Sequence, residues 1–180
     1  MLRGFQAAIS ALSILIVVSA GVLIYINYSA FPEGPMRAVC SPTRVGNYLF
    51  EAYVFPATPM VNEEFQITAS IQGSSPSQKP VNLTLILLKP ARVSIVEGPE
   101  VAPLGIKTWY YRLPEEGVYA VYFIVSGPEG SGEIEGSLRI VSINEAETYS
   151  LIRTLSYTSL WIGIPLLIGI VVFSKMREGA

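Results

Sequence analysis

The chain has 180 residues, of which 51% are apolar and only 14% are charged, and this balance excludes an ordinary soluble protein of that length. Histidine is absent and all fourteen acidic residues are glutamate, which excludes Ser-His-Asp and Cys-His relays, HExxH zinc sites, cupredoxin copper sites and Asp-rich calcium loops. Cys40 is the only cysteine, so an intrachain disulfide is also excluded.

The first predicted element is an apolar segment at the N-terminus. Residues 7–28 carry no charged side chain, and this run is long enough to cross a bilayer and longer than the core of a cleaved signal peptide. We predict an uncleaved transmembrane signal-anchor helix over residues 1–30.

Arg3-Gly4-Phe5 before this run resembles the leader of archaeal type IV pilin-like proteins, and that resemblance implies a filament protein that is cut after the glycine.

Residues 31–44 contain three prolines and no hydrophobic periodicity. Proline interrupts helices and the interior of sheets, so we predict an extended stalk here.

Residues 45–143 show short runs of alternating apolar and polar residues, separated by glycine and proline, which is typical of an all-β domain. The alternation is clearest in residues 64–72, where every second side chain is apolar. About seven antiparallel strands in 100 residues predict an immunoglobulin-like sandwich. The expected strands are 45–55, 64–72, 81–88, 92–97, 105–113, 117–126 and 133–143, with turns at Gly98-Pro99 and Gly127-Pro128.

The segment Glu115-Glu116-Gly117-Val118-Tyr119-Ala120-Val121 resembles the stretch that leads into the sixth strand of immunoglobulin-like domains, a class that includes fibronectin-like and bacterial or archaeal cell-surface modules. The resemblance implies that Tyr119 is a corner tyrosine whose hydroxyl bonds back to the chain across the turn. Val121 stands where antibody domains have cysteine.

Two features of the predicted sandwich suggest contacts with other molecules. Trp109 and Tyr111 point to the opposite face of their strand from Tyr110, so at least one aromatic side chain should be exposed as part of a partner surface, with core packing as the other role. Asn82-Leu83-Thr84 is a glycosylation sequon on an outward-facing strand position.

Residues 144–180 predict a second transmembrane helix. Asn144 and Glu147 have the spacing of a helix start, and 155–173 is an uncharged apolar run. Pro165 should loosen or kink the helix. The small residues Gly163 and Gly169 should let it approach other helices closely.

The ends of the two spans predict their orientation. Arg153, Tyr157 and Trp161 before the second span, and Lys175 and Arg177 after it, are typical interfacial anchors. The basic tail and Arg3 favour both termini in the cytoplasm, with the sandwich on the other side of the cell membrane. A sandwich followed by Ile162-Gly163-Ile164-Pro165-Leu166-Leu167 resembles the β subunit of the translocon-associated protein complex.

We therefore expect a non-catalytic accessory or structural subunit of a larger membrane complex, without cofactor or metal, whose helices contact other integral membrane subunits and whose sandwich contacts an extracytoplasmic protein. The alternative is a cell-surface adhesin or pilin-like filament protein. Residues 31–150 hold eight basic residues and thirteen glutamates, a net charge of −5 that argues against nucleic acid as a partner. The missing aspartate and the abundance of Ile, Val, Tyr and Pro hint at a thermophilic, archaeal source.

Overall fold

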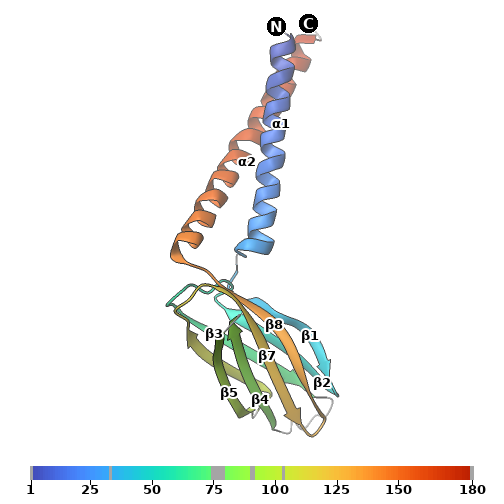
Figure 1. Cartoon of the computed structure of the whole chain (residues 1–180). Coiled ribbons are helices and arrows are strands. Elements are labelled where there is room, and N and C mark those ends of the chain that lie inside the picture. The colour runs from blue at the N-terminus through green and yellow to red at the C-terminus, as the bar shows by residue number, and fades with distance from the viewer. Residues whose placement is uncertain (1, 33, 74–79, 90–91, 103, 179–180) are drawn as a thin grey trace. The chain divides into compact units, whose positions relative to one another are not determined.

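The computed structural model describes residues 2–32, 34–73, 80–89, 92–102 and 104–178 (Figure 1). The chain divides into two compact units. The terminal segments, up to Pro32 and from Asn144 onward, form a helical unit, and the segment between them forms a β-sandwich.

The helical unit consists of α1 (Leu2–Tyr25), the short π-helix η1 (Ile26–Ala30) that continues it, and α2 (Ile143–Glu178). The segments Gln6–Ala30 and Ile143–Met176 have mean hydropathies of 2.6 and 1.9, and both are long and apolar enough to cross a membrane. Only 11% of the most apolar window of each is buried. A helix in the core of a soluble protein would be mostly buried, so these helices have the exposed apolar surface of membrane-spanning helices.

Helix α2 begins earlier than the sequence suggests. Asn144 lies inside its first turn, where the Asn144 carbonyl accepts a hydrogen bond from Thr148 Oγ1 at 2.8 Å. Ser142, with Glu145 three positions later, has the capping-box spacing at the observed start. The helix continues through Pro165 without interruption.

The sandwich is immunoglobulin-like and contains two four-stranded antiparallel sheets, with strand orders β1-β2-β3-β6 and β5-β4-β7-β8 (Figure 1). Its eight strands are β1 (Arg37–Val45), β2 (Tyr48–Phe55), β3 (Glu64–Gln72), β4 (Val81–Lys89), β5 (Arg92–Ala102), β6 (Ile106–Arg112), β7 (Gly117–Gly127) and β8 (Gly130–Ile140). The apolar residues of each alternating strand fill the space between the sheets. In β3, for example, Phe65, Ile67, Ala69 and Ile71 are all buried.

The predicted stalk over 31–44 is wrong for most of its length, because residues 37–45 form β1 and pair with β2. This strand also raises the count from about seven to eight. Its pairing with β2 shifts register between Ala38 and Cys40 and again between Cys40 and Thr43, so that adjacent Val39 and Cys40 are both buried. These irregularities remove the period of two by which a strand is recognised in a sequence.

The predicted turn at Gly98-Pro99 is also wrong, whereas the turn at Gly127-Pro128 is present. Strand β5 continues through Gly98 and Pro99, which form a bulge where the register with β4 shifts between Leu83 and Leu85. Gly127 and Gly130 face each other across the β7–β8 hairpin. A glycine-proline pair therefore marks a bulge at one place in this chain and a hairpin at another.

The two open edges of the sandwich are closed in different ways. At one edge β1 lies close against β8: a Cβ added to Gly136 of β8 would lie 2.6 Å from the carbonyl oxygen of Val39 on β1. The turns that follow and precede these strands are also joined, because the Asn47 N–H donates a hydrogen bond to the Glu129 carbonyl at 3.1 Å. At the other edge an ion pair joins Lys107 of β6 to Glu100 of β5. Both closures protect edge strands from pairing with other chains.

Candidate functional site

Helices α1 and α2 contact each other through Gly163, one of the glycines that the sequence predicts for helix packing. A Cβ at this position would lie 3.2 Å from Ile16 Cγ1 and 3.7 Å from Leu12 Cδ1, so the absence of a side chain lets the helices approach. At Gly169, by contrast, an added Cβ would have no described atom within 4 Å. Pro165 is exposed. Gly163 therefore belongs to the contact within the helical unit, and Gly169 lies outside it.

A polar cluster around Arg153 joins α2 to the C-terminal end of η1. Arg153 Nε donates to Asn27 Oδ1 at 2.9 Å, and Arg153 Nη2 donates to the Phe31 carbonyl at 2.5 Å. The guanidinium carbon lies 5.4 Å from the centre of the Phe31 ring, on which the Tyr149 ring stacks with 5.9 Å between centroids. Tyr157 lies beside the cluster, with its hydroxyl 3.5 Å from Asn27 Nδ2. We call Asn27, Phe31, Tyr149 and Arg153 the Arg153 cluster.

The Arg153 cluster supplies what the end of η1 lacks. The last turn of η1 contains no basic residue, although the carbonyls at a helix C-terminus carry partial negative charge and need donors. From the neighbouring helix, Arg153 provides a positive charge and a donor to the Phe31 carbonyl, and it also binds the Asn27 side chain. The sequence predicts Arg153 only as an interfacial anchor, because its partners lie more than 120 residues away in the chain.

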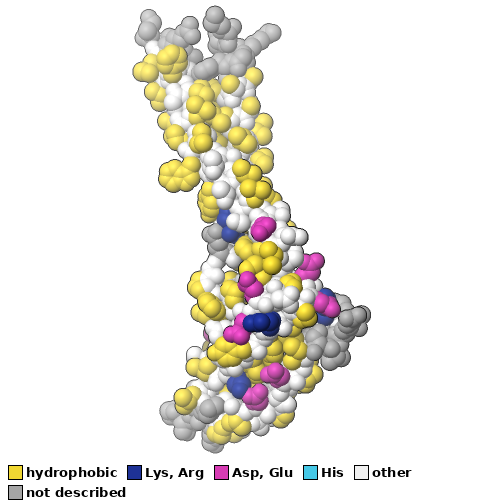
Figure 2. Space-filling model, turned by 90° about the vertical axis from the view of Figure 1, so that its left-hand side faces the viewer, with side chains coloured by type: hydrophobic (Ala, Val, Ile, Leu, Met, Phe, Trp, Pro, Cys, Tyr) yellow, Lys and Arg dark blue, Asp and Glu magenta, His cyan; other side chains and the backbone are white. Residues whose placement is uncertain are grey.

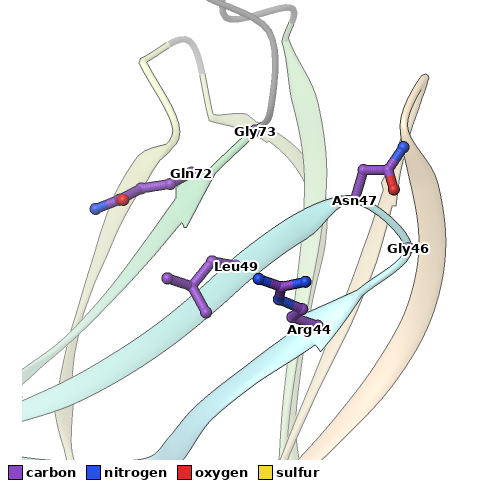
Figure 3. A pocket seen from close by; sticks show the side chains of 6 residues that line it. All are labelled: Arg44, Gly46, Asn47, Leu49, Gln72 and Gly73. Atoms are coloured by element: carbon purple, nitrogen blue, oxygen red, sulfur yellow. The ribbon is translucent and has the colours of Figure 1, made fainter.

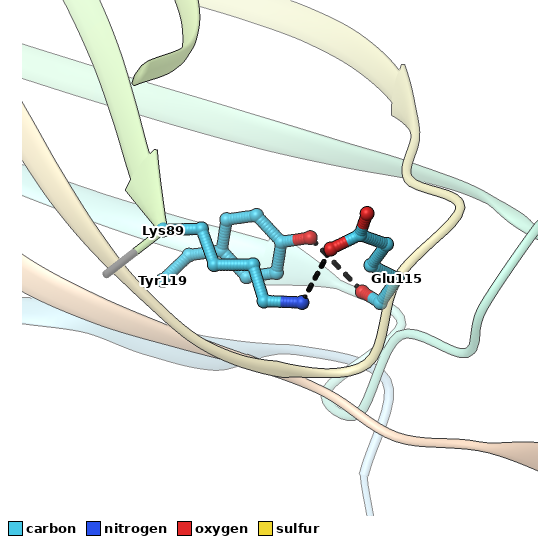
Figure 4. Close-up of polar contacts among 3 residues, drawn as sticks. All are labelled: Lys89, Glu115 and Tyr119. Atoms are coloured by element: carbon cyan, nitrogen blue, oxygen red, sulfur yellow. Dashed lines mark hydrogen bonds and ion pairs between the residues drawn. The ribbon is translucent and has the colours of Figure 1, made fainter. Parts of the chain in front are cut away.

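Tyr119 and Gly117 lie at one corner of the sandwich (Figure 4). The Tyr119 hydroxyl donates to the Glu115 carbonyl at 2.9 Å, which is the bond that a corner tyrosine should make. Lys89 pairs with the Glu115 carboxylate at 2.7 Å, and its ammonium lies 5.8 Å from the centre of the Tyr119 ring. Burial raises the pKa of Tyr119, and the charge of Lys89 partly offsets this. The corner ties the end of β4 to the β6–β7 loop and has a structural role.

The aromatic residues of β6 divide between core and surface. Trp109 and Tyr111 are buried, with ring centroids 6.3 Å from Phe123 and 6.0 Å from Phe65 respectively. Neither can form a partner surface. Tyr110 points to the other face and is 65% exposed, as the alternation predicts for at least one of the three.

The sequon residue Asn82 lies on β4 with its side chain exposed on the outer face of the β5-β4-β7-β8 sheet. Its neighbours across the sheet are Val101 on β5 and Ser126 on β7. The position is accessible, and glycosylation of Asn82 stays a prediction.

The outer face of the same sheet carries a group of neighbouring apolar side chains that the sequence analysis did not single out. Ile86 of β4 pairs with Val96 of β5, and Leu88 of β4 pairs with Ala120 of β7. Val96 and Val118 are 58% and 56% exposed. We define the apolar strip as Ile86, Leu88, Val96, Val118, Ala120 and Ile124. The strip is bordered on β8 by two exposed carboxylates, since Glu133 pairs with Ile124 and Glu135 with Tyr122.

An open hollow of about 310 Å3 lies beside the β1–β2 turn (Figure 3). Arg44, Leu49 and Gln72 form one row across β1, β2 and β3 on its floor. The hollow is lined by Arg44, Gly46, Asn47, Leu49, Gln72 and Gly73. A guanidinium and two amides can hold a polar or anionic group, but this lining offers no general acid or base for catalysis.

No group of three or more His, Cys, Asp or Glu side chains in the described ranges is placed to hold a metal ion. Cys40 is buried and forms no disulfide, and burial raises the pKa of its thiol. A thiol with a raised pKa is mostly protonated at neutral pH and a poor nucleophile.

Comparison with known proteins adds no family. No family model matches the chain, and neither does any curated protein. Among solved structures, the PmoD soluble domain from Methylocystis sp. ATCC 49242 is 11% identical over 56% of this chain and 97% of its own, with a TM-score of 0.39. The PKD domain of an M14-like peptidase from a Thermoplasmatales archaeon is 9% identical over 56% of this chain and 99% of its own, with a TM-score of 0.36. The CARDB domain of a Pyrococcus furiosus protein is 13% identical over 56% of this chain and 99% of its own, with a TM-score of 0.32. All three matches are too distant to transfer a function.

Proposed function

We propose that the chain is a non-catalytic accessory subunit of a membrane protein complex, anchored by α1 and α2, with the sandwich as its protein-binding domain. The observation that carries the proposal is the exposed apolar surface of the helical unit. Side chains such as Val17, Ile164 and Trp161 are 69%, 45% and 79% exposed. Figure 2 shows that apolar side chains dominate the visible face of the helical unit, whereas most of the visible charged side chains lie on the sandwich. An exposed apolar surface of this size favours contact with lipid tails or with other apolar helices over contact with water.

The sandwich supports the same proposal through its apolar strip. The exposed Val96 lies beside the half-buried Ile86, and further apolar side chains of the strip lie on β7. Apolar side chains on three strands of one outer face form the kind of surface that protein partners cover. Glu133 and Glu135 beside the strip favour a partner with basic residues at the edge of its own apolar patch. The partner in this proposal is an extracytoplasmic protein with such a surface.

Purification of the full-length chain in mild detergent, followed by native mass spectrometry, tests the proposal. We expect a complex of fixed stoichiometry with at least one other integral membrane subunit. The double variant Ile86→Lys/Val96→Lys should lose an extracytoplasmic partner, since two charges would be buried unpaired in the contact. Thr68→Lys, on the outer face of the other sheet, serves as the matched control and should keep that partner.

Two results would contradict the proposal. A lone monomer from mild detergent would remove the case for an accessory subunit. An intact mass that corresponds to a chain beginning at Phe5 would instead favour the pilin-like alternative, because that leader is cut after Gly4.

A further inference from the structure

The edge of the sandwich between β5 and β6 holds a group of polar side chains with no part in the proposed function. These strands are edge strands of different sheets, joined by the ion pair between Glu100 and Lys107. We define the β5–β6 seam as Glu97 and Glu100 of β5 with Lys107, Trp109 and Tyr111 of β6.

Two hydrogen-bond donors are buried in the seam without an acceptor. Trp109 is 3% exposed and Tyr111 is 6% exposed, and neither Trp109 Nε1 nor the Tyr111 hydroxyl has a partner among the described residues. An unsatisfied buried donor costs about 1–3 kcal/mol, so proteins nearly always pair such groups with protein or with ordered water. Two such donors, on alternate residues of one strand, point to a bound molecule that accepts hydrogen bonds.

The β5 side of the seam narrows the choice of that molecule. Burial raises the pKa of Tyr111, and the negative charges of Glu97 and Glu100 raise it further. Glu97 is thus close to the Tyr111 hydroxyl, although the geometry between them falls short of a hydrogen bond. A molecule that accepts hydrogen bonds from tyrosine and indole next to two carboxylates should carry no negative charge, and water meets both requirements.

We propose that the β5–β6 seam is a binding site for buried water, held by the Tyr111 hydroxyl and the Trp109 indole N–H on β6, beside the acidic residues of β5. A buried water usually makes two to four hydrogen bonds, and the two donors of β6 supply two of them. The two edges of the sandwich then differ in kind: direct backbone approach closes β1 against β8, and an ion pair with internal water closes β5 against β6.

Nuclear magnetic resonance of the full-length chain in detergent micelles tests the site. Labelling with 15N-tryptophan gives two indole N–H signals, from Trp109 and Trp161, and Trp161→Phe assigns them. We expect a rotating-frame Overhauser cross-peak between the Trp109 indole proton and a long-lived water, and we expect Tyr111→Phe to weaken it. A wild-type Trp109 signal without this cross-peak would overturn the proposal.

Stability gives an independent readout. If water satisfies the hydroxyl, Tyr111→Phe removes a hydrogen bond and should lower the Tm of the sandwich by about 4 °C. The matched control is Tyr110→Phe, the 65% exposed neighbour on the same strand, which should leave the Tm unchanged. A Tyr111→Phe variant as stable as the wild type, or more stable, would show that the hydroxyl is unsatisfied, and the site would not exist.

Discussion

At the scale of single residues, two polar groups of this protein, the half-buried Arg153 and the exposed Glu115, each contact more than one partner. Arg153 is bound by Asn27 and Phe31, and Glu115 is bound by both Tyr119 and Lys89. Removing one member of such a group leaves the others with an unmet hydrogen bond, so single substitutions should have effects larger than the exposure of these residues suggests.

Tyr111 makes the stability of the sandwich depend on pH in the alkaline range. Burial, followed by the charges of Glu97 and Glu100, raises the pKa of Tyr111 above its ordinary value near 10. The folded state therefore keeps the proton that the unfolded state loses. This contribution is complete below pH 10 and is lost as the pH rises further, toward the pKa of the folded state.

The prediction is a shallower loss of stability for Tyr111→Phe than for the wild type between pH 10 and pH 11. The free energy of unfolding at each pH, measured by near-ultraviolet circular dichroism in detergent, checks it. Trp161→Phe, a residue of α2 outside the seam that does not titrate, is the control and should keep the wild-type slope. Equal slopes for Tyr111→Phe and wild type would refute the assignment to Tyr111.

At the scale of elements, two close contacts depend on glycines. Gly163 lets α2 approach α1, and Gly136 lets β8 approach β1. At both positions a methyl group would meet atoms of the neighbouring element, which is a flexible side chain at Gly163 and the backbone at Gly136. An added side chain at Gly136 should therefore destabilise the protein more than the same side chain at Gly163.

Gly136→Ala should lower the free energy of unfolding by about 1–3 kcal/mol, the typical cost of overpacking. The added Cβ would lie 2.6 Å from the Val39 carbonyl oxygen and 3.1 Å from Val39 Cγ1, so β1 must move. Chemical denaturation of the sandwich measures the effect. Ser137→Ala, at the next and outward-facing position of β8, is the control. A stable Gly136→Ala variant would mean that β1 and β8 are farther apart than described.

Arg153→Gln should weaken the association of α1 with α2 by about 1–3 kcal/mol, because hydrogen bonds to a charged group and the charge at the end of η1 are lost together. Arg153→Lys should recover only part of this, since one ammonium cannot reproduce the planar guanidinium.

An SDS titration, followed by energy transfer between dyes at Gln6→Cys and Met176→Cys in a Cys40→Ala background, reports helix separation. Arg139→Gln, in the sandwich, should leave the midpoint unchanged. If Arg153→Gln behaved like this control, the Arg153 cluster would not hold the helices together.

The sequence predicts well where one local pattern decides the structure, and poorly elsewhere. Seven strands and the hydrogen bond of Tyr119 followed from alternation and from a short motif. Strand β1 did not, because its bulges break the alternation. The partners of Arg153 and the apolar strip were also missed, since both depend on contacts between segments that only the fold brings together. Alternation places Trp109 and Tyr111 on one face of β6 and Tyr110 on the other, but it does not say which face is buried. The burial of Trp109 and Tyr111 is therefore known only from the structure.

At the scale of the whole molecule, the two units separate two kinds of surface. The helical unit is apolar on its exposed faces, whereas the sandwich carries the excess of negative charge. Helix α2 has 36 residues and is therefore about 54 Å long, against about 30 Å for the hydrocarbon core of a bilayer. In a bilayer of this thickness, the first turns of α2, which include Glu145 and Glu147, would extend beyond the hydrocarbon. The Arg153 cluster would then lie at the membrane surface, where a guanidinium is tolerated.

This arrangement predicts the orientation of the chain in the cell membrane. Lys175 and Arg177 follow the second span and Arg3 precedes the first, and basic residues that flank short spans stay in the cytoplasm. Arg153 lies at the other end of the second span and is hydrogen-bonded to Asn27 and Phe31. We therefore expect its charge to affect the orientation less than the charges of Arg3, Lys175 and Arg177.

In a Cys40→Ala background, a membrane-impermeant thiol reagent added to intact cells should label Ser137→Cys on the sandwich. It should label Gln6→Cys and Met176→Cys only after the membrane is permeabilised. Labelling of the two terminal positions in intact cells, with Ser137→Cys protected, would reverse the topology. The sandwich would then face the cytoplasm, and both glycosylation at Asn82 and an extracytoplasmic partner would be impossible.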